Sequence, residues 1–521
     1  MSVNSIKNLI KIANDLTPTK IAIKDKDTSF TFEELYTKVN QIAQYLTTLE
    51  LEDGARIGIY SNKSSYKVIA ILSVISTKYV FVPITKILKA EQVQYIIDDC
   101  DIQCILTDEK KLPIIEETTF KGTLVTVESC NKDIVSFEEI FKCYKGDYEC
   151  KINGHDNCAI TYSFASSGLP KGIVISHKNF IDSARVVSEY LNLTQDDTLS
   201  GLLSFSFDYG LNQIFCALYK QATFVIHTFF TPSEFFTHLI KDNVTVLALM
   251  PIHITQMFDE DTHRLPNPQQ LDNIKTITSS GGILTNKMMT NIEEYFTNAK
   301  FYSMIGHTEA FRSAYLDPSQ LKIRPTSIGK AIVDVELYVI NKDGNECKPR
   351  EVGELIHRGV GIYKGFWNSK VDTNSSFKSI SILKNIIKNE TGLTDEIVVA
   401  TGDFVYKDED GYLYFISRKD DMIKSSGYRI SPVEIENVVS SNFPNITTCA
   451  VFGIENEDIE EEIVLVYSAK NELVKNELIF ELKKHLPSFM IPTTIIYKQN
   501  IPMQQEDKNK VNKQILKDEI L

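Results

Sequence analysis

Apolar residues recur at helical spacing near the N-terminus. Residues 31–46, TFEELYTKVNQIAQYL, place Leu35, Val39, Ile42 and Leu46 on one stripe, which predicts an amphipathic helix. RIGIYS (56–61) then predicts a short strand. Helix-like and strand-like runs alternate from there on, namely VIAILSVIS (68–76), YVFVPI (79–84), QCILTD (103–108), IFCALY (214–219), ATFVIH (222–227), VTVLALM (244–250) and IKTITSS (274–280). This alternation predicts a layered α/β body.

The pattern changes after about Phe415. IENVV (435–439) predicts a helix, CAVFGI (449–454) and EIVLVYSA (462–469) predict strands, and a Lys-rich tail follows Pro502. We therefore expect two parts, a large multi-subdomain N-terminal body of layered sheets and helices (1–417) and a small α+β C-terminal domain (418–521). The boundary is expected near Arg418 to Asp421.

Composition and charge narrow the class of protein. The 521 residues are 43% hydrophobic and 24% charged, which is typical of a globular protein and excludes collagen-like, disulfide-rich and disordered classes. Lys+Arg 55 against Asp+Glu 69 gives 55 − 69 = −14, so nucleic acid and anionic membranes are unfavourable partners. Any anionic substrate would need locally gathered positive charge.

The cysteines and the apolar runs predict the cellular compartment of the protein. The 9 cysteines include no CxxC pair, which favours a reduced cytoplasmic protein with buried thiols over a zinc or disulfide framework. The N-terminus has apolar residues at helical spacing but no continuous apolar stretch or cleavage site, so no signal peptide is expected. Lys78 and Pro83 interrupt the most apolar region, Val68 to Ile84, which predicts a core helix and strand instead of a membrane span.

A phosphate-binding loop is a candidate between two predicted strands. In AITYSFASSGLPKGIVISHKNF (159–180), small and hydroxyl residues lead to Gly168, Pro170, Lys171 and Gly172. Hydroxyls and backbone N–H groups of such a loop can surround phosphate oxygens, and Lys171 adds a cation. Because it is not a GxxxxGK[ST] loop, the segment alone is equally compatible with an ordinary turn.

Further motifs follow in a fixed order along the chain. They are SFSFDYGLNQIF (204–215), SSGG (279–282), IGHTEA (305–310), GELIHRGVGIYKGFWN (353–368), TGD (401–403), RKDDMIKSSGYRISPVEIE (418–436), LPSFMIP (486–492) and KNKVNK (508–513). Together with the loop, this ordered set resembles the adenylate-forming enzymes, which include acyl-CoA synthetases, adenylation domains of nonribosomal peptide synthetases and stand-alone ligases that load carrier proteins. FDYGLNQ and GHTEAFRSAYLDP further resemble bacterial ligases that serve acyl or aminoacyl carrier proteins.

The resemblance implies a two-step reaction with ATP and Mg²⁺. A substrate carboxylate attacks the α-phosphate to give an acyl adenylate and pyrophosphate, and a pantetheine thiol then displaces AMP. Both steps build charge on oxygen, which cations and a metal stabilise. Glu309 resembles the Mg²⁺ ligand and Thr308 the hydroxyl that contacts the α-phosphate. Lys171 resembles the cation of the phosphate loop.

The C-terminal motifs imply a mobile domain. Asp420 matches the hinge about which that domain rotates between the two half-reactions. Gly427 matches the position where the pantetheine arm passes the backbone. Lys510, which precedes Val511, resembles the catalytic lysine that bridges the substrate carboxylate and the α-phosphate, with Lys508 as the competing assignment because KNKVNK lacks the usual glycine.

The same resemblance implies a set of nucleotide contacts, in which Asp403 would bind both ribose hydroxyls and Arg418 would contact ribose and phosphate. The complete set expected to contact ATP or AMP is Ser163, Ser166, Ser167, Gly168, Lys171, Ser280, Gly281, Gly282, Ile305, Gly306, Thr308, Asp403, Phe415, Arg418 and Lys510.

Two positions depart from the family pattern. Phe164 and Ala165 replace a small hydroxyl residue and a glycine in the phosphate loop, so the backbone there is less free to adopt positive φ. Ile305 stands where the family commonly has a tyrosine that stacks on adenine, which would cost about 1 kcal/mol of aromatic contact.

Asp208 bears on the class of substrate. It falls where amino-acid-activating members carry the Asp that pairs with the α-ammonium group, which favours an amino acid, although a protein cation is an alternative partner. Arg312 could bind a second carboxylate or neutralise Asp208. The pocket expected by alignment is too polar for a long fatty chain and comprises Asp208, Tyr209, Asn212, Ala248, Thr278, Ser280, Met304 and Arg312.

Three functional hypotheses follow. The first is a stand-alone ligase that loads an amino acid onto a phosphopantetheinylated carrier protein, since no fused carrier domain is found before Leu521. The second is an acyl-CoA synthetase that uses free CoA. The third is a nucleotide-binding regulatory protein without turnover.

Overall fold

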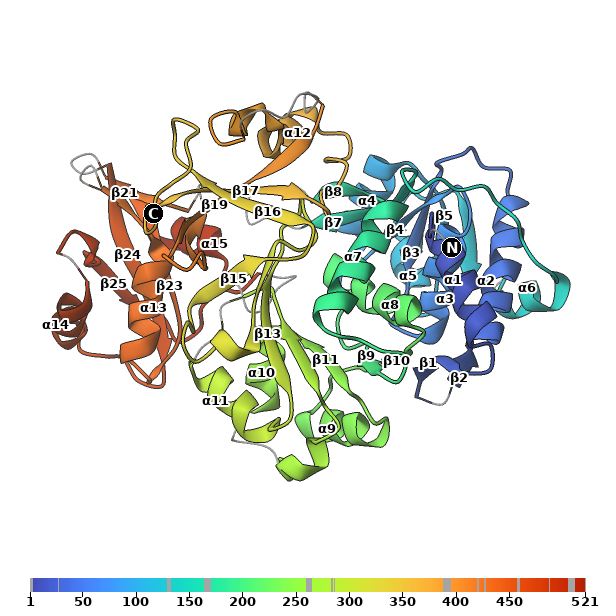
Figure 1. Ribbon diagram of the computed structural model, residues 1–521, viewed down its shortest axis with the longest axis horizontal. Coiled ribbons are helices and arrows are strands. Elements are labelled where there is room, and N and C mark those ends of the chain that lie inside the picture. The colour runs from blue at the N-terminus through green and yellow to red at the C-terminus, as the bar shows by residue number, and fades with distance from the viewer. Residues whose placement is uncertain are drawn as a thin grey trace.

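The computed structural model describes residues 3–26, 28–128, 133–163, 170–258, 265–282, 284, 286–387, 395–418, 421–425, 428–456, 460–486, 488–504 and 511–520. Within these ranges the chain forms three β-sheets with helices packed on them (Figure 1). The predicted α/β class is confirmed.

The first sheet has six strands, and its neighbours are parallel except for the antiparallel pair β7 and β8. Its strands in spatial order are β6 (Thr123–Thr126), β5 (Ile102–Thr107), β3 (Arg56–Tyr60), β4 (Val80–Pro83), β7 (Asn157–Ser163) and β8 (Lys171–Ser176).

The second sheet has fourteen strands and runs through the middle of the molecule. One half is a parallel run with a single antiparallel edge strand, formed by β13 (Lys300–Ile305), β12 (Thr276–Ser279), β11 (Val246–Leu249), β9 (Thr198–Ser200), β10 (Thr223–Ile226), β1 (Ile21–Asp25) and β2 (Thr28–Thr31). The other half is antiparallel, formed by β14 (Ala314–Leu316), β15 (Ser327–Ala331), β20 (Leu413–Arg418), β19 (Ile397–Lys407), β17 (Gly353–Gly359), β16 (Val335–Ile340) and β18 (Phe377–Ser379).

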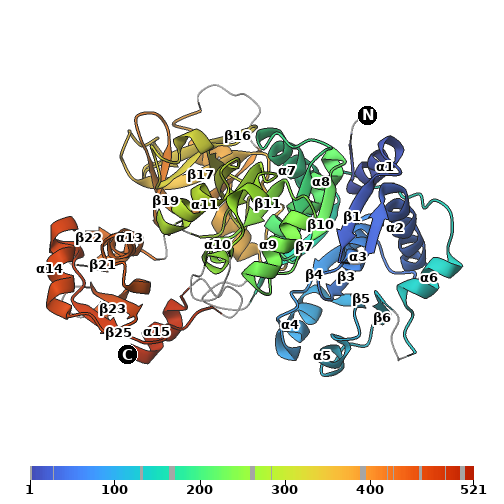
Figure 2. The ribbon, with the colours of Figure 1, turned by 90° about the horizontal axis from the view of Figure 1, so that it is seen from below.

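The third sheet belongs to the C-terminal part of the chain. It comprises β22 (Tyr428–Ile430), β21 (Ile423–Ser425), β24 (Glu460–Ala469), β23 (Ile446–Asn456) and β25 (Thr494–Tyr497). Two buried clusters on this sheet use only residues from Ile423 onward, so this unit has hydrophobic cores of its own. Figures 1 and 2 both place it at the opposite end of the molecule from the six-stranded sheet. The predicted boundary at 417/418 stays a prediction.

Helices cover the sheets and form connections between strands. They are α1 (Ile6–Leu16), α2 (Phe32–Thr47), α3 (Ser65–Ile75), α4 (Ala90–Cys100), α5 (Leu112–Glu116), α6 (Phe137–Cys143), α7 (His177–Tyr190), α8 (Asp208–Lys220), α9 (Pro232–Lys241), α10 (Pro251–Met257), α11 (Asn286–Tyr295), α12 (Lys370–Ser376), α13 (Pro432–Asn442), α14 (Lys475–His485) and α15 (Lys513–Ile520), with 3₁₀ turns at Pro268–Leu271, Pro318–Gln320, Ile380–Leu383 and Ser488–Met490.

Local signals explain where the predicted helix at 31–46 begins. The Thr31 hydroxyl accepts a hydrogen bond from the Glu34 backbone N–H, while the Glu34 carboxylate accepts one from the Thr31 N–H. This capping box satisfies two N–H groups that the helix itself leaves free. The four apolar residues of the predicted stripe are all buried, so α2 confirms the prediction.

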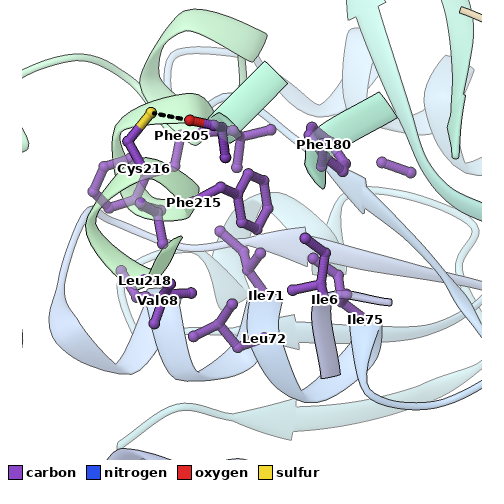
Figure 3. Close-up of a cluster of buried hydrophobic side chains, with 14 of the residues drawn as sticks. Ile6, Val68, Ile71, Leu72, Ile75, Phe180, Phe205, Phe215, Cys216 and Leu218 are labelled. Carbon is purple, nitrogen blue, oxygen red and sulfur yellow. Dashed lines mark hydrogen bonds between the residues drawn. The ribbon is translucent and has the colours of Figure 1, made fainter. Parts of the chain in front are cut away.

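The core that supports the site lies where four helices meet. Ile6 of α1, Ile71 of α3, Phe180 of α7 and Phe215 of α8 contribute to one cluster (Figure 3), in which the rings of Phe180 and Phe215 have centroids 4.6 Å apart. Close packing on this side of α8 fixes the position of the helix. Its first residue, Asp208, is thereby held in a defined place.

Two sequence predictions, one about thiols and one about membrane spans, can be compared with the structure. Val68 to Ile84 forms α3 and β4, as predicted, and no described helix is long and apolar enough to cross a membrane. The eight described cysteines are free thiols. Cys100, Cys104, Cys158 and Cys216 are buried as expected, whereas Cys143 is exposed, because it ends a short helix at the surface.

Candidate active site

The predicted phosphate loop connects β7 and β8. Ser163, the last residue of β7, pairs with Lys171, the first residue of β8, across an antiparallel ladder. The two strands predicted on either side of the loop are therefore confirmed. The loop residues lie outside the described residues, namely Phe164, Ala165, Ser166, Ser167 and Gly168.

Lys171 has a carboxylate partner that the sequence did not indicate. Its Nζ lies 2.6 Å from Oδ1 of Asp372 in α12. The hydrogen bond from Lys171, assisted by one from Ser369, lowers the pKa of Asp372, so this carboxylate is ionised at neutral pH. A phosphate group that binds Lys171 has to compete with Asp372.

A tight turn after β13 carries the IGHTEA motif. The backbone N–H of His307 donates to the Ala310 carbonyl at 2.9 Å, and the N–H of Ala310 donates back at 3.2 Å. Gly306 is required there, because a Cβ at this position would lie 2.2 Å from the Phe311 carbonyl oxygen. The turn leaves Thr308 exposed and Glu309 half-buried.

Glu309 is fixed from two sides. Its carbonyl oxygen accepts a hydrogen bond from the Tyr363 N–H at 3.0 Å, and its Oε1 accepts one from the Ser376 hydroxyl at 3.1 Å. Ser376 and Asp372 both belong to α12, so one short helix contacts both the predicted metal ligand and Lys171. A single accessible carboxylate suits Mg²⁺, which is usually held by one or two carboxylates together with substrate phosphates and water.

Asp403 lies in β19 directly opposite Arg418 in β20. Its side chain is buried, with Oδ2 3.0 Å from Nε2 of His307 and Oδ1 3.2 Å from Nε of Arg418. Although Arg418 is near enough for an ion pair, the contact does not have hydrogen-bond geometry, and Oδ1 has no hydrogen-bond partner among the described residues. Asp403 and Arg418 are thus brought together as the sequence motifs suggested, while His307 is a partner that they did not indicate.

The SSGG segment follows β12 at the same edge of the large sheet. Gly281 adopts φ +86°, a conformation that glycine tolerates best, and a Cβ on Gly282 would lie 3.1 Å from Cγ of Pro251. The Ser280 hydroxyl accepts a hydrogen bond from Arg312 at 3.1 Å. Ile305 and Phe415, also expected near the nucleotide, are half-buried against the main core.

Asp208 is the first residue of α8, and neighbouring groups compensate the negative charge of its carboxylate only in part. Its Oδ1 accepts a hydrogen bond from the Tyr209 N–H at 2.7 Å, and its Oδ2 accepts one from the Tyr363 hydroxyl at 3.4 Å. Burial raises the pKa of Asp208, although the nearby charge of Arg312 and these two hydrogen bonds act in the opposite direction. Within the described residues Asp208 has no ion pair, and Tyr363 is a neighbour that the sequence analysis missed.

The Arg312 side chain points inward, as it must if it binds a second carboxylate or neutralises Asp208. It is 3% exposed, its guanidinium lies 5.0 Å from the ring centroid of Tyr209 and 4.9 Å from that of Phe311, and its Nε has no hydrogen-bond partner in the described part of the chain. The Tyr209 hydroxyl in turn lies 2.7 Å from Oγ1 of Thr278. Five of the predicted pocket residues therefore form one polar cluster, namely Asp208, Tyr209, Thr278, Ser280 and Arg312.

The remaining pocket predictions are less closely connected to this cluster. Met304 is buried with its sulfur 3.0 Å from the Tyr190 hydroxyl, and Ala248 is buried in β11. The Asn212 side chain donates to the Ser183 hydroxyl at 3.2 Å, so its amide faces α7. Asn212 lies one helical turn beyond Asp208 in α8, and its predicted contact with substrate stays a prediction.

Several predicted residues lie outside the described residues. They are the hinge residue Asp420, the pantetheine-channel residue Gly427 and the two candidate catalytic lysines, Lys508 and Lys510. Their roles stay predictions.

A cavity of about 1160 Å³ lies elsewhere, between the N-terminal segment and α7. Asn4, Asp53, His155, His177 and Lys364 are among its lining residues, and none of the predicted site residues lines it. Its size alone does not make it the catalytic centre, since the titratable groups of the motifs converge around Asp403, Glu309 and Asp208.

Comparison with known proteins identifies the class. The family model of AMP-binding enzymes matches residues 11–367. The chain belongs to this family of AMP-binding enzymes. Membership in a family of enzymes favours the two ligase hypotheses over the regulatory protein without turnover.

Among curated relatives, tyrocidine synthase 1 of Brevibacillus parabrevis is 24% identical over 97% of this chain, and zwittermicin A synthase ZmaJ of Bacillus cereus is 25% identical over 96%. The chain spans 44% of the length of the first and 92% of the second. Among solved structures, ATP-bound MatB from Rhodopseudomonas palustris matches with a TM-score of 0.86 at 21% identity, over 99% of both chains. MenE, the o-succinylbenzoate CoA synthetase from Bacillus subtilis, matches with a TM-score of 0.82 at 22% identity, over 98% of both chains.

Proposed function

We propose that this protein activates a small polar carboxylic acid, an amino acid, as an aminoacyl adenylate and transfers it to the phosphopantetheine thiol of a carrier protein. The observation that carries the choice of substrate is Asp208, a half-buried carboxylate without an ion pair among the described residues, beside the polar groups of Tyr209, Thr278 and Arg312. A substrate ammonium group would supply the missing cation.

Each of these residues would contact the metal ion, the phosphates or the ribose. Glu309 would hold Mg²⁺ and Thr308 would contact the α-phosphate, while Lys171 and Lys510 would add positive charge. Asp403 would accept hydrogen bonds from ribose, with Arg418 beside it. In the first step a carboxylate oxygen of the substrate bonds to the α-phosphorus and pyrophosphate leaves. In the second step the thiol sulfur bonds to the acyl carbon, AMP leaves and the thiol proton passes to solvent.

Amino-acid-dependent exchange between ATP and pyrophosphate tests this proposal. We expect one amino acid, or a few of similar size with polar side chains, to support exchange, and the same acids without the amino group to be at least about 100-fold poorer, because breaking a buried ion pair costs about 3–5 kcal/mol. The measurement is an exchange screen over amino acids and short polar acids. Exchange that is equally fast without the amino group would contradict the amino acid assignment.

The thiol acceptor has a competing candidate. Zwittermicin A synthase ZmaJ and the peptide synthetases are relatives in sequence, whereas MenE is described as a CoA synthetase and resembles this chain in fold. Loading assays with holo carrier protein against free CoA distinguish the two acceptors. Faster thioester formation with CoA would replace the carrier-protein assignment and leave the adenylation step intact.

The catalytic lysine can be assigned by a matched pair of variants. We expect Lys510→Ala to reduce adenylation by about 100-fold or more, because it would remove a cation from the charge that develops at the α-phosphate, while thioester formation from supplied adenylate stays within about threefold. Lys508→Ala is the control and should change neither step by more than a few-fold. A larger loss in Lys508→Ala would reverse the assignment, and equal loss of both steps in Lys510→Ala would contradict a specific role in adenylation.

A further inference from the structure

A continuous line of buried polar contacts leads away from Asp403. Nε2 of His307 lies 3.0 Å from Asp403 Oδ2, its Nδ1 lies 3.0 Å from the Ser313 hydroxyl, that hydroxyl lies 2.9 Å from Nδ1 of His357, and Nε2 of His357 lies 2.9 Å from the Val360 carbonyl oxygen. Asp403 is 4% exposed, His307 8%, and Ser313 and His357 are fully buried. We call these residues the His307 relay.

The far end of the relay determines the direction of each hydrogen bond. The Val360 carbonyl has no proton, so His357 must donate from Nε2, and burial lowers the pKa of His357 to about 4, which keeps its ring neutral and makes Nδ1 an acceptor. The Ser313 hydroxyl therefore donates to His357, and its oxygen accepts from Nδ1 of His307. Nε2 of His307 is thereby left to face Asp403, and it lies 3.0 Å from Oδ2.

This arrangement leaves the two carboxylate oxygens of Asp403 in different situations. Oδ2 is held by His307, whereas Oδ1 is buried and makes no hydrogen bond among the described residues, although Nε of Arg418 lies 3.2 Å from it as an ion-pair partner. The carboxylate cannot rotate about its axis without breaking the bond to His307. A buried acceptor that lacks a donor gains more from a ligand hydroxyl than one already satisfied.

We propose that His307 is a positioning residue, which orients the Asp403 carboxylate so that Oδ1 accepts a hydrogen bond from a ribose hydroxyl of the nucleotide. This inference rests on the proposed ribose role of Asp403. His307 itself does not touch the nucleotide; it acts by removing the rotational freedom of the group that does. Preorganised acceptors bind more tightly because less ordering is required on binding.

Binding of AMP and its deoxy analogues tests the proposal without Mg²⁺ or a carboxylic acid substrate, so effects through Glu309 do not enter. Dissociation constants of AMP, 2′-deoxyAMP and 3′-deoxyAMP are measured by calorimetry for the wild-type chain and for His307→Leu. We expect removal of the hydroxyl that faces Oδ1 to weaken binding to the wild type by about tenfold or more. In His307→Leu, the dissociation constant of AMP should rise about tenfold, while that of the corresponding deoxy analogue should rise much less. The ratio of these two dissociation constants should therefore fall to about threefold or below.

His307→Gln is the conservative variant. Its Nε2 amide can donate to Asp403 from about the same reach and should restore most of the ratio. His227→Leu is the matched control, because His227 is another buried histidine between a serine and a carboxylate, 2.8 Å from the Ser200 hydroxyl and 3.0 Å from Asp242, away from the candidate site. This variant should leave the ratio at the wild-type value.

Equal weakening of AMP and both deoxy analogues in His307→Leu would show a merely structural role and overturn the proposal. If circular dichroism shows that His307→Leu is unfolded, Ser313→Ala decides instead. It removes the middle of the relay with little change in volume, and an unchanged ratio in that folded variant would overturn the proposal as well. A wild-type chain that binds none of the three nucleotides would contradict the proposed nucleotide site itself, a failure distinguishable from loss of the relay alone.

Discussion

Replacing Glu309 with glutamine is expected to slow ATP–pyrophosphate exchange by about a thousandfold, since the metal contribution in such reactions is worth several kcal/mol and each 1.36 kcal/mol is tenfold in rate. Glutamine keeps the size of the side chain and an Oε1 acceptor for Ser376, so the turn after β13 should persist. What is lost is the negative charge that a Mg²⁺ ion requires. The Mg²⁺ concentration for half-maximal exchange should rise as well.

Exchange rates are measured at saturating amino acid over a Mg²⁺ titration. Glu409→Gln is a matched control, because Glu409 makes an exposed ion pair with Arg350 at 2.8 Å and exposed pairs contribute little. Its exchange rate and Mg²⁺ dependence should equal those of the wild type. An unchanged Mg²⁺ dependence in Glu309→Gln, together with nearly normal exchange, would show that another group holds the metal.

Asp208→Asn is expected to reduce kcat/KM for the amino acid substrate by about 100-fold or more, because it would leave a buried ammonium group without its counter-charge. Asparagine has nearly the same shape and retains an acceptor for the Tyr209 N–H. The KM for ATP should stay within about twofold, since Asp208 lies with Tyr209 and Tyr363 in the polar cluster and is not among the predicted nucleotide contacts.

A matched substrate separates recognition of the amino group from general damage. The same acid without its amino group should react with Asp208→Asn about as well as with the wild type, so discrimination between the two acids collapses. Asp15→Asn, which removes an exposed partner of Lys11 in α1, is the control variant and should retain full discrimination. Equal losses on both acids would indicate that Asp208 serves Arg312 and the fold instead of the substrate.

Much of the fold could be predicted from local patterns. The stripe at Leu35, Val39, Ile42 and Leu46 specifies one face of α2, because helical side chains return to the same face every three to four residues. The strands predicted from short apolar runs are present as well, because such runs suit strands buried between packed layers, and β7 and β8 follow in the predicted order.

The contacts between those motifs could not be predicted. Lys171 meets Asp372 across 201 residues, and His307 meets Asp403 across 96. These pairs depend on which strands are neighbours and in what register they pair, and no local periodicity contains that information. His307 is part of the IGHTEA motif, but the sequence does not indicate which residue it contacts, because that depends on the order of the strands in the sheet.

By itself the sequence determined the resemblance to a family, a part of the helices and strands, and the identity of the charged residues available for the reaction, because each of these is recorded in short stretches of chain. The tertiary structure alone decided that Arg312 points inward and that α12 contacts both Lys171 and Glu309. It also decided that one oxygen of Asp403 is held by His307 while the other makes no hydrogen bond in the described part of the chain. The physical reason is that burial and hydrogen-bond satisfaction are properties of packed neighbours, and those neighbours come from strands and helices far apart in the chain.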